Sequence, residues 1–201
     1  VFPGRTEALN RSHDDAAYPG EIVARIEPAA TPGPRARISV LGTFDVHAVD
    51  GQRARWTSRK ARSLLKILVA RRGSPIAREQ IMAMLWPDED PTDLGNRMAV
   101  AVSTVRRALD PSRTLPTDAM VRADAGSLRL VTAALDIDVE TFLRQAASAL
   151  EAHRAGRSDA GSLLRTALTA YQGEAMPDEP YEEWADGLRS TTTAAYTDLL
   201  R

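Results

Sequence analysis

The chain has 201 residues, enough for one large domain or two small ones, and its hydrophobic fraction of 43% is that of an ordinary globular protein. It contains no cysteine, which excludes disulfides, thiolate metal sites and cysteine nucleophiles and is consistent with a reducing cytoplasm. No apolar run approaches the roughly 20 residues of a membrane span, and the first residues do not form a signal peptide. We therefore expect a cytoplasmic protein with no membrane segment in this chain.

The net charge of −1 conceals an uneven distribution of charge. Residues 37–132 carry 16 Lys and Arg against 10 Asp and Glu, whereas residues 133–201 carry 6 against 12. A basic segment followed by an acidic one predicts two domains, of which the basic one faces a polyanion. An ordinary solvated surface of mixed charge is the alternative interpretation.

Residues 1–36 are predicted to be a linker or the tail of an upstream region. They are rich in Ala, Pro, Gly and Asp, and the three prolines of residues 28–34 disfavour a helix. A pattern typical of short β-strands then begins at residue 37. Its alternating apolar residues are Ile38, Val40, Phe44 and Val46. Gly42 marks a turn, and Asp50-Gly51 is a hairpin signal.

Three helical segments follow this β region. They are predicted over about 58–72, 77–86 and 91–109. Ser58 is a suitable N-cap for the first helix, and Gly73 suits its C-terminal end. Pro87 stops the second helix, after which Pro87–Asp90 forms an acidic loop. The third helix has a clear start signal, because Asp90 can cap it while Pro91 occupies its first position.

A hairpin is predicted after the third helix. Two short runs of β alternation, 120–123 and 128–131, flank the turn sequence Asp124-Ala125-Gly126-Ser127. Strands, three helices and a hairpin, in this order, describe a winged helix-turn-helix. We assign this α+β domain to residues 37–132.

The remaining residues, 133–201, are predicted to be all-α. Helices are expected over about 139–154, 158–171 and 181–200, in which Ala, Leu and an aromatic residue recur at helical spacing. Packed helix pairs of this kind are typical of tetratricopeptide-like arrays. The sequence stops at Leu199-Leu200-Arg201 without a cap, so we expect this helical domain to be incomplete at the C-terminus.

The third helix has two chemically different faces. On a helical wheel its core stripe consists of Leu94, Met98, Ala101, Val102, Val105, Ala108 and Leu109. The opposite face consists of Asn96, Val100, Ser103 and Arg107, with Arg97 and Thr104 at its edge. Residues 94–109 contain no Glu, Asp or Lys, which is unusual for a helix face in solvent.

This polar face suits the major groove of DNA. Arg can pair bidentately with guanine, Asn can pair with adenine, and Val can touch a thymine methyl group. A carboxylate would repel the phosphates. A surface helix that happens to lack acidic residues is the alternative.

Other basic residues would position the protein on the phosphate backbone rather than read bases. At the start of the first helix these are Arg59, Lys60 and Arg62, and at its end Arg71 and Arg72. In the hairpin, Arg122 or Arg129 can reach the adjacent backbone or the minor groove.

With these residues in place, the chain resembles the antibiotic regulatory protein family of actinobacterial transcriptional activators. Members combine an OmpR-type winged helix-turn-helix with a bacterial transcriptional activator domain. The stretches that carry the resemblance are ISVLGTF at 38–44, SRKARSLL at 58–65, LWPD at 85–88, NRMAVAVSTVRRAL at 96–109, YQG at 171–173 and PYEEW at 180–184. Together they extend over roughly residues 37–201.

The resemblance implies a sequence-specific activator that binds direct repeats in promoter DNA and recruits RNA polymerase, and it allows a homodimer on those repeats. It also implies a polymerase contact through the loop of Asp88, Glu89 and Asp90. The wing departs from the family pattern Gly-Tyr-Arg-Leu, because this chain has Ser127-Leu128-Arg129-Leu130. No phosphoacceptor receiver domain is visible.

Two other function classes were compared with this one. An enzyme is not expected, because the three histidines lack metal-ligand spacing and neither a phosphate loop nor a nucleophile elbow is present. No cofactor or metal is expected either. The stronger alternative is a protein-interaction module, in which the winged helix is a docking surface and the helical repeat an effector surface, without specific DNA binding.

Overall fold

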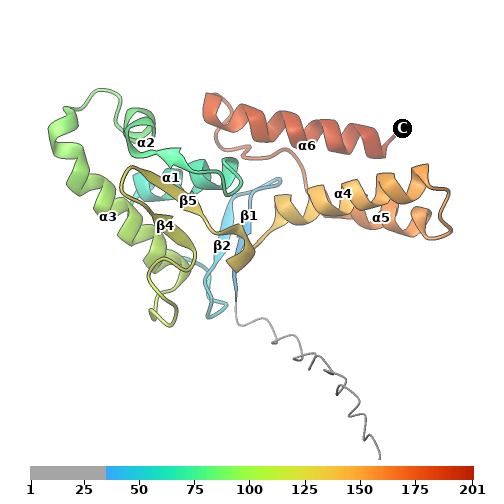
Figure 1. The fold of residues 1–201 in the computed structure, drawn as a ribbon, viewed down its shortest axis with the longest axis horizontal. Coiled ribbons are helices and arrows are strands. Elements are labelled where there is room, and N and C mark those ends of the chain that lie inside the picture. The colour runs from blue at the N-terminus through green and yellow to red at the C-terminus, as the bar shows by residue number, and fades with distance from the viewer. Residues whose placement is uncertain (1–34) are drawn as a thin grey trace, which may run out of the picture. The chain divides into compact units, whose positions relative to one another are not determined.

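The structure is a computed structural model that describes residues 35–201. The predicted linker of residues 1–36 lies almost wholly outside the described residues. The described chain contains two three-stranded sheets and six α-helices (Figure 1). None of the helices described is both long enough and apolar enough to cross a membrane.

The first sheet has the strand order β2-β1-β6. Its strands are β1 (Ala36–Ser39), β2 (Asp45–His47) and β6 (Leu135–Ile137). β1 pairs with β2 in antiparallel fashion, with Ile38 opposite Val46, and with β6 in parallel fashion, with Ile38 opposite Ile137. The alternation that predicted β1 and β2 is confirmed, and Gly42 between them has a φ of +72°. β6 was not predicted, because three residues between a hairpin and a helix carry little periodic signal.

Three helices follow the first two strands. They are α1 (Arg59–Ala70), α2 (Arg78–Leu85) and α3 (Pro91–Leu109). The Ser58 hydroxyl accepts a hydrogen bond from the Ala61 amide at 3.2 Å, which confirms the predicted N-cap. α1 ends at Ala70 with Arg71 as its C-cap, two residues before the predicted end. The residue after the cap is therefore Arg72, with a φ of +50°, and Gly73 follows it with a φ of +81°.

The second sheet contains the predicted hairpin. Its strands are β3 (Ile76–Ala77), β4 (Val121–Ala123) and β5 (Ser127–Leu130), in the order β3-β5-β4. Val121 lies opposite Leu130 in the hairpin, and Ile76 of β3 lies opposite Leu128. The two-residue β3, placed just before α2, was not predicted. Together, α1 to α3 and this hairpin form a winged helix-turn-helix.

The helical part follows β6. Its helices are α4 (Asp138–Arg154), α5 (Ala160–Ala170) and α6 (Asp186–Leu199), and α6 packs against both others (Figure 1). Aromatic side chains join the three helices: Tyr171, next to α5, contacts Phe142 at 5.1 Å and stacks on Tyr196 at 4.2 Å between ring centroids.

The prediction that the last helix begins at residue 181 is wrong. A short 3₁₀ turn, Glu183–Ala185, precedes α6 instead. The Arg189 guanidinium donates to the backbone carbonyls of Glu179 at 2.8 Å and Glu182 at 3.0 Å. These two hydrogen bonds hold the chain before the helix in turns, so α6 begins only at Asp186.

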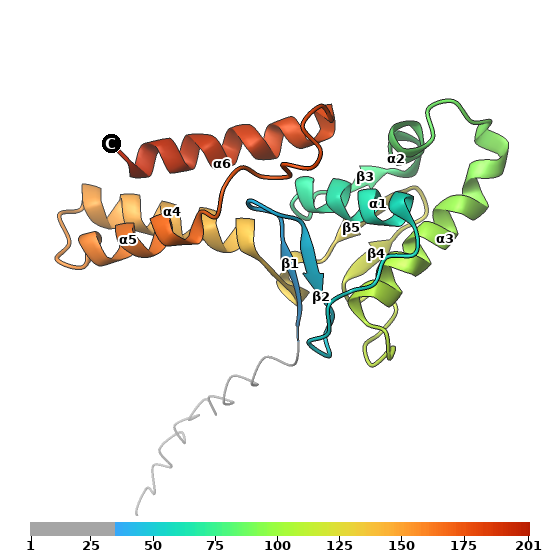
Figure 2. The same ribbon diagram turned by 180° about the vertical axis from the view of Figure 1, so that it is seen from behind.

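A half-buried carboxylate joins the first sheet to α4. Asp138 accepts hydrogen bonds from the amides of Val40 at 2.9 Å, Leu41 at 3.0 Å and Val139 at 2.7 Å. Burial raises the pKa of Asp138, and the hydrogen bonds from these amides offset part of that rise. Figure 2 shows β1 between α1 and the start of α4.

A second junction links α1 to the loop before α6. The Lys66 side chain is 1% exposed, and its ammonium donates to Asp178 at 2.5 Å and Glu179 at 2.7 Å. Backbone bonds run beside it, from Gly42 to Glu174 and from Met176 to Val40, both at 2.9 Å. The described residues from 35 on therefore belong to one compact unit.

Replacing Asp138 with Ala should lower the free energy of unfolding by about 3 kcal/mol, because three backbone amides lose their acceptor and desolvated donors are costly. Denaturant unfolding measures this value. Asp136→Ala is the matched control, because the Asp136 side chain is half exposed and forms an ion pair with Arg35 at 3.7 Å. This variant should change the free energy of unfolding by less than about 0.5 kcal/mol. Equal losses in the two variants would contradict a role for Asp138 in this junction.

Candidate nucleic-acid interface

The third helix presents the two faces that its sequence predicts. Every residue of the core stripe is buried, and Met98 and Val105 are fully covered. Asn96, Ser103 and Arg107 are exposed, and Val100 is 65% exposed, which is high for a valine. Because the buried stripe fixes the rotation of α3 about its axis, the polar face is directed to solvent as one continuous surface.

The two residues at the edge of this face have internal partners. Arg97 pairs with Glu89 of the loop between α2 and α3. The Thr104 hydroxyl donates to the Val100 carbonyl, one turn earlier, at 2.8 Å. Neither side chain is therefore as free to contact another molecule as the four residues at the centre of the face.

Arg106, the neighbour of Arg107, contacts the hairpin of the protein itself, a role that its sequence position did not predict. Its guanidinium donates to the Val121 carbonyl of β4 through Nη2 at 2.7 Å and Nε at 3.2 Å. This contact fastens the hairpin to α3. The helical wheel placed Arg107 on the exposed face and assigned no role to Arg106.

The hairpin presents its two arginines on one face. Arg122 of β4 lies directly opposite Arg129 of β5, while Val121, Leu128 and Leu130 are buried on the other face. Like charges directly opposite each other are unfavourable unless an anion lies between or beside them. The pair therefore suits a phosphate contact.

The three basic residues at the start of α1 differ in their surroundings. Arg59 is exposed and has no side-chain partner among the residues whose side chains the structure describes. Lys60 donates to the Leu85 carbonyl at the end of α2. Arg62 pairs with Asp178 at 3.1 Å and lies over the Phe44 ring. Only Arg59 of the three is free to reach outward without breaking a contact.

At the other end of α1, Arg72 is also committed to the protein. Its guanidinium makes a two-pronged contact with the Glu140 carboxylate of α4, at 2.7 and 2.8 Å. The hydrogen bond to Glu140 raises the pKa of Arg72. Arg71 is exposed.

The acidic loop between α2 and α3 is exposed at Asp88, Glu89 and Asp90. Glu89 is the partner of Arg97, so the loop is tied to the first turns of α3. Asp88 remains directed to solvent.

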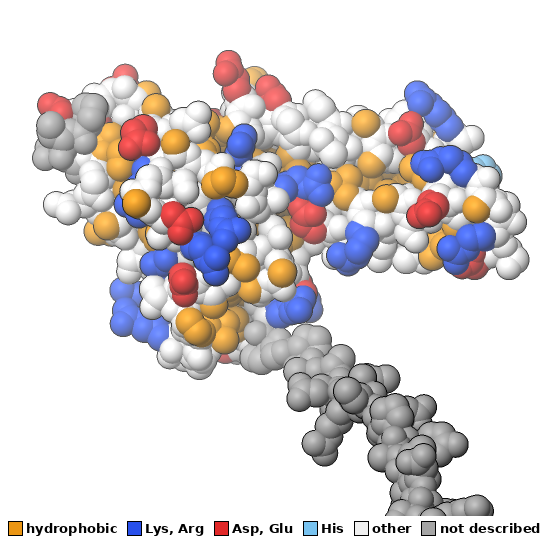
Figure 3. Space-filling model, in the orientation of Figure 1, with side chains coloured by type: hydrophobic (Ala, Val, Ile, Leu, Met, Phe, Trp, Pro, Cys, Tyr) orange, Lys and Arg blue, Asp and Glu red, His pale blue; other side chains and the backbone are white. Residues whose placement is uncertain are grey.

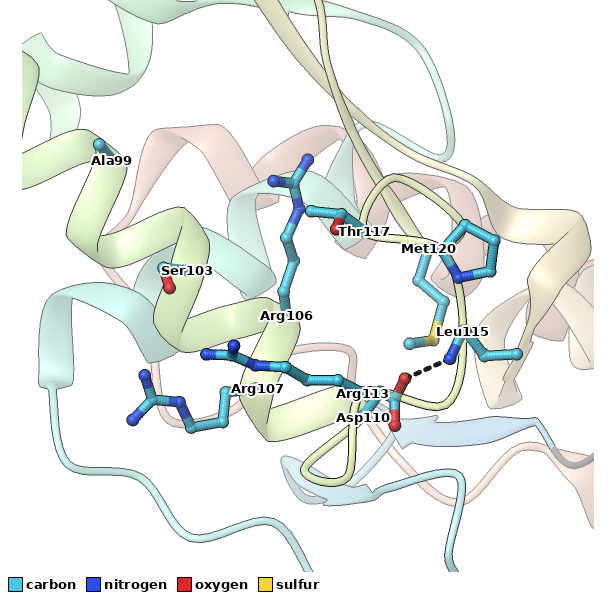
Figure 4. Close-up of a pocket in the computed structure, with 10 residues that line it drawn as sticks. Ala99, Ser103, Arg106, Arg107, Asp110, Arg113, Leu115, Thr117 and Met120 are labelled. Atoms are coloured by element: carbon cyan, nitrogen blue, oxygen red, sulfur yellow. Dashed lines mark hydrogen bonds between the residues drawn. The ribbon is translucent and has the colours of Figure 1, made fainter.

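A groove lies along the C-terminal half of α3, on the side of the loop that leads to the hairpin (Figure 4). Its polar lining includes Ser103, Arg106, Arg107, Arg113 and Thr117. Arg113 belongs to no predicted site, because it lies in a loop that the helical pattern does not cover. In the space-filling view, basic side chains gather over the lower end of α3 and over the hairpin, with a few acidic ones between them (Figure 3).

The described residues offer no metal centre. No group of three His, Asp or Glu among the described side chains, which leave out residues 91–93, could hold a metal ion.

Replacing Arg106 with Ala should lower the free energy of unfolding by about 1–2 kcal/mol, because the hairpin loses a charged donor pair to the Val121 carbonyl. Urea unfolding measures the change. Arg107→Ala is the control and should leave stability within about 0.5 kcal/mol, since its side chain is exposed. The reverse order of stabilities would contradict this division of roles.

A comparison with models of known protein families gives a match for part of the chain. Residues 52–122 match the family model described as transcriptional regulatory protein, C terminal. The match extends from before α1 into β4. None of the curated proteins compared matches the chain.

A solved structure has a similar fold. It is Mycobacterium tuberculosis EmbR in complex with a low affinity phosphopeptide, which superposes with a TM-score of 0.69 and 20% identity over 83% of this chain. The superposition covers 44% of the EmbR chain, so the present chain spans less than half of that protein. Residues 52–122 thus have the sequence pattern of the C-terminal domain of transcriptional regulatory proteins.

Proposed function

We propose that this protein is a sequence-specific DNA-binding transcription activator that binds direct repeats in promoter DNA through α3 and recruits RNA polymerase. The observation that carries the proposal is the exposed face of α3, which offers amide, hydroxyl, guanidinium and one apolar group and no carboxylate. The match of residues 52–122 to a transcriptional regulatory domain supports it.

The chemistry of this face suits base edges in the major groove. Arg107 can pair with guanine O6 and N7, and Asn96 with adenine N6 and N7. Val100, 65% exposed, can contact a thymine methyl group, and Ser103 can donate or accept. A valine left in water gains from such an apolar contact, because burying its surface is favourable.

The phosphate contacts are assigned by availability. Arg59, Arg122 and Arg129 can bind phosphates without losing an ion pair. Four other side chains must exchange an internal partner for a DNA contact, so each contributes less net affinity than Arg59, Arg122 or Arg129. They are Lys60, Arg62, Arg97 and Thr104. Contacts of this kind set the register of the protein on the duplex.

We divide the chain into a DNA-binding domain at residues 37–132 and the start of an activator domain at residues 133–201. In this proposal the second domain is tetratricopeptide-like, and its acidic surface is the effector or self-association surface of a homodimer on direct repeats. We place this activity in the cytoplasm, where promoter DNA and polymerase meet.

Selection from a pool of random duplexes, followed by a salt titration on the selected duplex, tests the proposal. If six to eight phosphates are neutralised, log affinity should fall with log salt at a slope of about −5 to −7. Footprinting on the selected duplex should show repeated half-sites in one orientation. Failure to enrich any sequence, with no salt-sensitive binding, would reject DNA recognition and favour a protein-interaction module.

Arg107→Ala should cost about 1–3 kcal/mol on the selected duplex and relax the preference at one base pair, because a bidentate contact to a base is lost. Competition against duplexes with single base changes measures both effects. Arg154→Ala, an exposed arginine at the end of α4, is the control and should bind as the wild type does. A uniform loss on all sequences would make Arg107 a phosphate contact.

Joint replacement of Asp88 and Glu89 with Ala should not lower duplex affinity, since loss of Glu89 leaves Arg97 free to contact DNA. It should reduce transcription from a promoter carrying the selected site, because the exposed loop is assigned to polymerase. In vitro transcription with and without the protein measures the second effect. A loss of duplex affinity comparable to the loss of transcription would contradict the assignment of the loop to polymerase.

A further inference from the structure

The groove beside the C-terminal half of α3 lies outside the helix face that is assigned to the bases. Its volume is 310 Å³. Figure 4 shows that α3 contributes one wall, through Ser103, Arg106 and Arg107, and that residues of the following loop, including Arg113 and Thr117, contribute the other. The groove therefore adjoins the face that would read DNA.

The loop that forms the second wall is held in one shape by Asp110. Its carboxylate accepts hydrogen bonds from the Leu115 amide at 2.8 Å and the Thr114 hydroxyl at 3.1 Å, and Asp110 is only 5% exposed. Burial alone would raise the pKa of Asp110, but these hydrogen bonds outweigh it and lower the pKa. The single acidic group of the groove is thus directed to the loop backbone rather than to an incoming anion.

Arg113 has an unusual backbone conformation within this fixed loop. Its φ is +51°, in the left-handed region that glycine or asparagine adopts more readily. Backbone strain of this kind is found at sites where the side chain has a function. The sequence places an exposed arginine at a position where glycine would be easier to accommodate.

Two guanidinium groups of the groove have no acidic partner. The side chains of Arg107 and Arg113 make no hydrogen bond or ion pair with any described residue, whereas Arg106 is held by Val121. In Figure 4, Arg107 and Arg113 extend to the same side of α3, and Arg106 points the other way. Because Arg107 is assigned to a base, Arg113 is the cation of the groove that is left for an anion, and a cation without a counter-charge favours anion binding.

We propose that this groove binds a phosphate group of the DNA backbone at the edge of the major groove, with Arg113 as a principal ligand. The proposal rests on the function assigned to α3. With the face of α3 in the major groove, the flank of the helix lies against a sugar-phosphate strand. Planar guanidinium groups match phosphate oxygens in geometry and charge. Arg113 adds affinity and register and reads no base.

Arg113→Gly is the test variant, because it removes the cation and relieves the backbone at the same time. Its unfolding midpoint should equal or exceed that of the wild type, while its affinity should fall roughly five- to tenfold at about 0.1 M salt on both the selected duplex and a random duplex. The salt slope should become shallower by about 0.9. Arg113→Lys should recover part of the affinity.

Arg72→Gly is the matched control. It makes the same substitution at another non-glycine residue of positive φ, 50°, whose guanidinium is held by Glu140. Its affinity for both duplexes should equal that of the wild type at equal folded fraction. Any loss equal to that of Arg113→Gly would show that backbone relief, and not the missing cation, changes binding.

The outcomes separate the groove proposal from the proposed function. If the wild type binds no duplex, the proposed function fails. If the wild type binds and Arg113→Gly binds equally well with the same salt slope, only the groove proposal is overturned. Stabilisation of the wild type by inorganic phosphate at constant ionic strength, with unchanged duplex affinity of Arg113→Gly, would assign the groove to a free anion and also overturn the proposal.

Discussion

The burial of α1 on nearly all sides is the constraint on which the rest of the structure depends. From Leu64 to Val69 every residue is buried, including Lys66. Neighbours on several sides provide this burial, because α1 packs against α2, α3 and β5 as well as the 3₁₀ turn before α6. A buried ammonium is stable only when it is paired, and Asp178 and Glu179 provide the partners. The charge of Lys66 therefore ties the loop before α6 to the winged helix.

This arrangement determines how the candidate interface is presented. α3 buries its apolar stripe against α1, so its rotation is fixed by the core and its polar face has one orientation. Arg106 then fastens the hairpin to α3 through Val121. The helix face and the hairpin arginines thus belong to one rigid surface, which reduces the ordering cost when a duplex binds. Asp110 holds the neighbouring loop in one shape through the hydrogen bonds that its carboxylate accepts.

Local patterns predicted much of the fold. Ser58 caps α1 as expected, α3 begins at Pro91, and the core stripe of α3 is buried throughout. These features depend on residues within one or two turns of each other, and the apolar period of a helix states directly which face is buried. The start of α6 was misplaced because the chain before it is held by Arg189, an interaction that helical periodicity does not contain.

The sequence by itself determined the type of domain and the chemistry of the exposed face of α3, since both follow from periodicity and from the absence of carboxylates between residues 94 and 109. Only the tertiary structure decided which basic residues are available. Arg62 meets Asp178, 116 residues later, and Arg72 meets Glu140, 68 residues later. Arg113 is brought beside Arg107 by a loop whose shape depends on a buried carboxylate. Contacts between distant residues depend on how whole elements pack, and no local pattern encodes that packing.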